Sequence, residues 1–104
     1  METRIENAYS YLEKATKDAY AAGENSISKK ELYDQSVAKA YAGGEVQGKN
    51  QAERDGWIAE HFQPEAENLF AAQEQERKAK LNLELARIEV EKTRALLRLM
   101  ELTR

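Results

Sequence analysis

Apolar and small residues recur at alternating three- and four-residue spacing along the C-terminal part of the chain, from Glu65 to Arg104. This stretch contains no Pro or Gly. As one α-helix it would be about 60 Å long, at about 1.5 Å per residue. The spacing predicts a coiled-coil-like seam, the inner seam, which consists of Leu69, Ala72, Glu76, Ala79, Leu83, Ala86, Val90, Thr93, Leu97 and Met100.

A second apolar stripe begins at Leu81 and follows a different face of the same helix. We call it the outer stripe; it consists of Leu81, Leu85, Ile88, Lys92, Ala95, Leu99 and Leu102. A helix with two apolar stripes needs two partners, and the rest of the chain is long enough to supply one. We therefore expect a homo-oligomer, with the interface carried by Leu83, Leu85, Ile88, Val90, Leu97 and Leu99.

The residues before this helix predict three shorter helices. The first carries a mostly alanine seam that starts at Ile5 and Ala8, and Gly23 is placed to end it. Ser28 and Glu31 have the spacing of a capping box, which predicts a second helix from there to the pair Gly43-Gly44.

The third short helix is predicted from Gln51 to about Phe62, because Asn50 can cap it and Glu53 follows three residues later. Gly56 interrupts its interior, and we interpret that glycine as a point of close packing beside Trp57.

The pattern as a whole predicts one all-α domain over residues 1–104. Residues 1–63 would form the three short helices and their loops, and these would pack on a long oligomerising helix over residues 64–104. Pro64 fits the first turn of that helix. The composition agrees, since 34% of the residues are charged and there is one Pro.

The charge distribution and the absence of cysteine exclude several classes of function. Residues 1–73 carry 8 Lys/Arg against 13 Asp/Glu, a balance of −5, whereas residues 74–104 carry 8 against 6, a balance of +2. This disfavours broad nucleic-acid binding, which needs a concentrated positive face. Without cysteine there is no disulfide and no thiolate metal site. No apolar run reaches the roughly 18 residues of a membrane span and no signal peptide is visible, so we expect a cytoplasmic protein without membrane association.

The glycine-rich loop over residues 43–50 has the ingredients of an anion site: flexible backbone, a lysine and a helix N-terminus. Its candidate ligand-binding residues are Lys49, Asn50 and Arg54, with Trp57 nearby. The loop lacks the spacing of a phosphate-binding P-loop, and the alternative interpretation is a plain connection between helices.

Residues with catalytic chemistry are scarce. His61 is the single histidine, and no nucleophile or orienting partner accompanies it in the sequence. Arg87, Arg94 and Arg98 are interleaved with glutamates, which is typical of a solvated, salt-bridged face. We therefore predict no catalytic residue, no metal site, no cofactor and no enzymatic activity.

Two stretches carry a resemblance to a known group of proteins. They are Gly48-Lys49-Asn50-Gln51-Ala52-Glu53-Arg54 and the ending from Leu85 to Leu99. They resemble small helical proteins of unassigned role encoded in the early regions of tailed bacteriophages. Those proteins also have a G-K-N-x-x-E-R turn into a short helix and a long C-terminal helix. The resemblance implies a phage origin and an accessory role in the cytoplasm of a bacterial host.

The predicted function is accordingly a non-enzymatic, homo-oligomeric phage accessory protein. It would counteract a host factor, such as a defence component, by binding a protein or by sequestering a small anionic signal. The alternative is an accessory in phage DNA recombination or replication that binds single-stranded DNA or a recombinase. The acidic N-terminal part disfavours that alternative.

Overall fold

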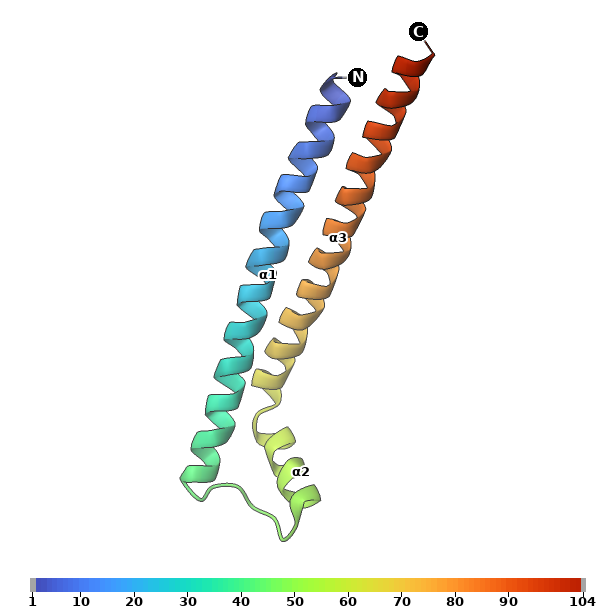
Figure 1. Cartoon of the computed structure of the whole chain (residues 1–104). Helices are drawn as coiled ribbons and strands as arrows, with labels where there is room; N and C mark the ends of the chain where they lie inside the picture. The colour runs from blue at the N-terminus through green and yellow to red at the C-terminus, as the bar shows by residue number, and fades with distance from the viewer. Residues whose placement is uncertain (1, 104) are drawn as a thin grey trace. The chain divides into compact units, whose positions relative to one another are not determined.

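A computed structural model describes residues 2–103 and contains three helices, α1 (Glu2–Ala42), α2 (Gln51–His61) and α3 (Gln63–Leu102) (Figure 1). No strand occurs among these residues. The all-α class is confirmed, and so is the long C-terminal helix with other helices packed against it.

The prediction of two separate helices before the glycine-rich loop is wrong, because α1 continues from Glu2 to Ala42 without a break. Gly23 and Ser28 both lie inside it. The physical reason is that the three- and four-residue spacing of the seam continues through this region, at positions that are all buried or half-buried: Ala19, Ala22, Ser26, Lys29, Tyr33, Ser36 and Ala40. Ser26 is only 7% exposed. Packing along a continuous seam outweighs the cost of one glycine, about 1 kcal/mol, and a local capping signal.

The end of α1 at the glycine pair is as predicted and has a Schellman geometry. The amide of Gly44 donates to the carbonyl of Tyr41 at 3.1 Å, and the amide of Glu45 donates to the carbonyl of Ala40 at 2.9 Å. Gly44 has φ +70°, a left-handed conformation that glycine adopts without a steric penalty.

The chain divides into two compact units, and the division falls inside both long helices. Unit 1 contains the residues up to Ala22 together with those from Gln75 onward. Unit 2 is Gly23–Glu74 and contains the rest of α1, the loop, α2 and the first turns of α3.

In unit 1 the first part of α1 and the last part of α3 lie side by side in antiparallel directions (Figure 1). Arg4 Nη2 lies 3.8 Å from Glu89 Oε1, and further along α1 the residues Tyr11 and Ala15 line a hollow with Asn82. Residue numbers therefore rise along α1 as they fall along α3.

The interior of unit 1 is made mostly of small side chains. Its buried residues are Ala8, Ala15, Ala86, Val90 and Thr93. Four larger residues of the two seams, Ile5, Leu12, Leu83 and Leu97, are only half-buried. The inner seam predicted for α3 is thus the face that packs on α1 from Leu83 to Leu97, whereas its last predicted member, Met100, is 49% exposed. Small residues allow the helices to approach closely, but they remove little apolar area from water.

Unit 2 has a thin interior of mixed polarity. Its buried residues are Ser26, Ala40, Ile58, Leu69 and Ala72. Half-buried polar side chains accompany them, among them Lys29, Ser36 and Glu65. A carboxylate oxygen of Glu65, Oε2, is buried without a hydrogen-bond partner.

Thr93 supplies a test of the inner seam. It is 1% exposed, and its hydroxyl has no hydrogen-bond partner. Thr93→Val keeps the shape and removes the unsatisfied hydroxyl, so we expect it to raise the free energy of unfolding by about 1 kcal/mol. Urea denaturation followed by circular dichroism measures this change.

The matched control is Thr16→Val on the exposed side of α1. The Thr16 hydroxyl donates to the carbonyl of Leu12 at 2.7 Å, and the residue is exposed. We expect little change for this variant. A loss of stability in Thr93→Val would show that the hydroxyl has a partner in solution.

Candidate functional site

The outer stripe of α3 is an exposed apolar face within unit 1. Its large residues are 48% to 79% exposed: Leu81, Leu85, Ile88, Leu99 and Leu102. Because successive helical residues are rotated by about 100°, these positions lie on a different side of α3 from the inner seam. One face of α3 therefore packs on α1, and the face that carries the outer stripe is exposed.

The predicted interface residues fall into two groups. Leu85, Ile88 and Leu99 lie on this exposed face. Leu83 and Leu97 are half-buried and Val90 is 6% exposed, because all three belong to the inner seam that packs on α1. The surface available to a partner therefore consists of the first group together with Leu81 and Leu102.

A groove of about 900 Å³ runs beside the outer stripe, between α1 and α3 of unit 1. Its walls are partly apolar, with Leu85 and Ile88 on one side and Ala8 and Tyr11 on the other. Charged residues border it: Arg4, Glu89 and Lys92. Apolar walls with a charged border suit the side chains of another helix.

A smaller hollow of about 250 Å³ lies further along α3 and is lined by Glu91, Arg94, Ala95 and Arg98. Ala95 is the smallest residue of the outer stripe, which explains why the surface is indented there. The hollow places one glutamate and two arginines beside the stripe.

The predicted anion site at the start of α2 is brought together only in part. Asn50 is the N-cap as predicted, and its Oδ1 accepts from the amide of Glu53 at 2.9 Å. The Glu53 carboxylate in turn accepts from the amide of Lys49 at 2.6 Å. The chain's own carboxylate therefore occupies a backbone donor that an anionic ligand would need.

Trp57 is turned toward the end of α2. Its ring stacks on that of His61 with the centroids 3.9 Å apart, and it meets Phe62 edge-on at 6.1 Å. Nδ1 of His61 lies 2.8 Å from the carbonyl of Trp57. Both side chains thus have structural contacts within one helix and its C-cap.

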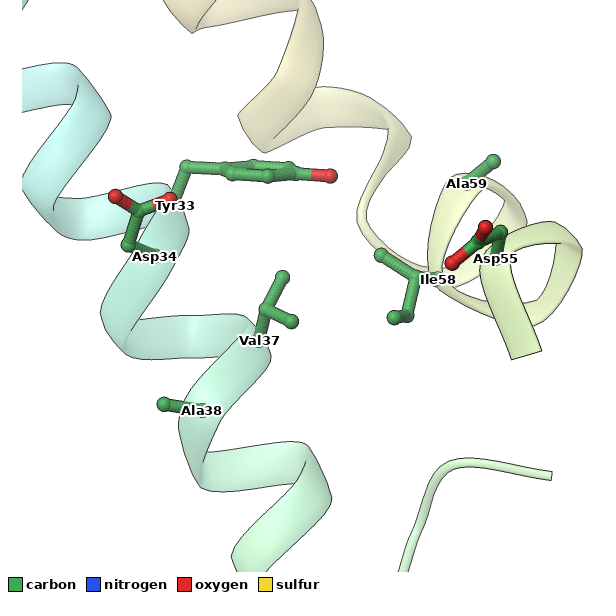
Figure 2. A pocket seen from close by; sticks show the side chains of 7 residues that line it. All are labelled: Tyr33, Asp34, Val37, Ala38, Asp55, Ile58 and Ala59. Carbon is green, nitrogen blue, oxygen red and sulfur yellow. The ribbon is translucent and has the colours of Figure 1, made fainter. Parts of the chain in front are cut away.

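Unit 2 contains a groove that the sequence pattern did not indicate. It measures about 420 Å³ and lies between α1 and α2, with Tyr33 and Val37 facing Ile58 (Figure 2). The carboxylates at its edges already have partners, since Asp34 pairs with Lys30 at 2.9 Å and Asp55 accepts from Gln51 at 2.7 Å. Only the contact between α1 and α2, which local patterns do not reveal, creates this groove.

Residues 2–103 contain no group of three His, Asp or Glu side chains arranged to hold a metal ion. Within the same range no helix is long and apolar enough to cross a membrane.

Comparisons with protein-family models, with curated proteins and with solved structures give no match to this chain. The resemblance to early-region phage proteins therefore stays a prediction.

One glycine before α2 and one in the middle of α2 give a matched test of this region. Gly48 has φ +149°, and a Cβ there would lie 2.7 Å from the amide nitrogen of Arg54. Gly48→Ala should therefore lower the free energy of unfolding by about 2 kcal/mol, through strain and loss of the Asn50 cap.

Gly56→Ala is the control, and it should raise the free energy of unfolding by about 1 kcal/mol, because alanine is the better helix former. A Cβ at Gly56 would meet nothing within 4 Å, so the interpretation of this glycine as close packing beside Trp57 is wrong. Denaturation of both variants measures the difference. Equal stability of the two would contradict the geometry of the loop.

Proposed function

We propose that this chain is a non-enzymatic binding protein that works as a homo-oligomer and uses the outer stripe of α3 as its binding face. The exposure of Leu81, Leu85, Ile88, Leu99 and Leu102 along one side of one helix is the observation that carries the proposal. Monomeric proteins seldom leave a contiguous apolar face of this kind in water, and such faces commonly mark protein interfaces.

The energetics support association through this face. Complete burial of one leucine or isoleucine side chain contributes about 1.5–3 kcal/mol. The large residues of the stripe are about half exposed or more, so several of them together supply enough apolar area for a stable contact after the cost of association. By contrast, the buried residues of unit 1 are mainly alanines.

A protein partner is better supported than a small anionic ligand. The amide of Lys49 is already bonded to Glu53, which weakens the loop before α2 as an anion site. Single-stranded DNA is also disfavoured, because Glu84 and Glu91 interrupt the arginines of α3. The resemblance to phage proteins leads us to propose a host factor, such as a defence component, as the further protein target.

Leu99→Glu tests the binding face. It places a charge within the stripe, opposite an apolar residue of the second copy, without harming helix propensity. We expect it to weaken self-association by about 2 kcal/mol, or about thirtyfold in the dissociation constant. Sedimentation equilibrium over a range of protein concentrations measures the change.

Leu32→Glu is the matched control, since Leu32 and Leu99 are both 56% exposed, but Leu32 lies on α1 in unit 2. It should associate as the unchanged protein does. An unchanged protein that sediments at 11.9 kDa at all concentrations would overturn the proposed function.

Native mass spectrometry of the protein taken from a bacterial lysate separates the remaining alternatives. We expect a multiple of the 11.9 kDa chain mass without additional small-molecule mass. Additional mass of nucleotide size would favour sequestration of an anionic signal instead.

A further inference from the structure

We infer that the outer stripe binds the same stripe of a second copy of this chain, with the two α3 helices antiparallel. This inference rests on the proposed function and specifies the partner and its orientation. The stripe follows a heptad pattern in which Leu85, Lys92 and Leu99 occupy the a positions, and Leu81, Ile88, Ala95 and Leu102 occupy the d positions.

Lys92 is the first reason for the antiparallel orientation. It is exposed and stands in the middle of an otherwise apolar stripe. In a parallel pair, a positions face each other, so two lysines would meet at the centre of the interface. In an antiparallel pair an a position faces a d position, and Lys92 would face an isoleucine or an alanine of the second copy. Its aliphatic stem can pack there while the ammonium group stays in water.

The charges beside the stripe also favour the antiparallel orientation. Glu84, Glu91 and Arg98 are all exposed and occupy the g positions next to the stripe. In an antiparallel pair, g faces g. One register pairs Arg98 of each copy with Glu91 of the other, and the other register pairs Arg98 with Glu84 but also sets the two copies of Glu91 against each other. In a parallel pair, g faces the next e position, so Glu84 would meet a second glutamate at position 89, and Arg98 would meet Thr103.

The outline of the surface is also compatible with this pairing. One antiparallel register places Leu81 on Leu99, Leu85 on Ala95 and Ile88 on Lys92. In that register the leucine at position 85 fills the hollow at Ala95, and the glutamate at position 84 reaches Arg98, which lines the same hollow. The register shifted by one heptad places Ile88 on Leu99 and Leu85 on Leu102, and pairs Arg98 with position 91.

The absence of cysteine makes the orientation directly measurable by disulfide formation. The variant Leu99→Cys is tested alone, mixed with Leu81→Cys, and mixed with Ile88→Cys. A disulfide needs Cα atoms within about 7 Å. In the two antiparallel registers the positions 99 of the two copies are separated along the axis by about 27 Å or about 16 Å, at about 1.5 Å per residue.

The expected result is a covalent dimer between Leu99→Cys and one of the other two variants, and no dimer of Leu99→Cys with itself. The reverse pattern, a rapid disulfide between two copies of Leu99→Cys, would show a parallel pair. It would overturn this inference but leave the proposed self-association standing. A protein that is monomeric and forms no disulfide in any mixture would overturn both.

Charge reversal gives a second, independent measurement. Arg98→Glu should weaken self-association at least tenfold at low salt, because it sets two glutamates against each other in either antiparallel register. Lys17→Glu is the control, since it makes the same charge reversal at an exposed position of α1 in unit 1, and Lys17 lines neither the groove beside the outer stripe nor the hollow at Ala95. Equal association of the two variants would contradict the antiparallel pairing.

Discussion

The packing of small side chains between α1 and α3 in unit 1 is the constraint on which the proposed function depends. Ala8 and Ala15 of α1 and Ala86 of α3 are almost completely buried. This brings the two helices close together but removes little apolar area from water. The larger residues of α3 then have no place inside the unit, and several remain on its outer face. The small size of the residues between the helices therefore accounts both for the thin interior and for the uncovered apolar stripe.

The spacing of small and apolar residues predicted the helices better than the local signals for their ends did. The inner seam of α3 was correct in its buried positions Leu69, Ala72, Ala86, Val90 and Thr93. The break predicted at Gly23 was wrong, although glycine and a capping box are normally good indicators. The seam continues through that point with its spacing intact, and packing on it decides the local structure. At Gly44 the seam ends, and there the local signal prevailed.

The candidate sites differ in how far the sequence can reveal them. The outer stripe was visible in the sequence as apolar residues that recur every three or four positions. The structure leaves its members Leu85, Ile88 and Leu99 exposed. The loop at Lys49 was ambiguous, since the residues that attract an anion to a helix N-terminus are also those that cap the helix. Glu53, which accepts from the Lys49 amide, favours the second role. The groove beside Ile58 depends on contacts between distant residues, so no local pattern contained it.

The inner seam and the outer stripe of α3 each contain a polar residue, and these two residues are adjacent in the sequence. Thr93 lies in the inner seam, buried and without a hydrogen-bond partner, and Lys92 lies in the exposed outer stripe. Polar groups in apolar seams cost stability, and their best-attested use is to fix register or orientation. Stripes of alanine or leucine alone would allow several registers and both orientations, because similar residues recur at each turn. In the dimer that we propose, Lys92 would disfavour the parallel arrangement of the two stripes, and so would give the contact a direction that apolar residues alone leave unspecified.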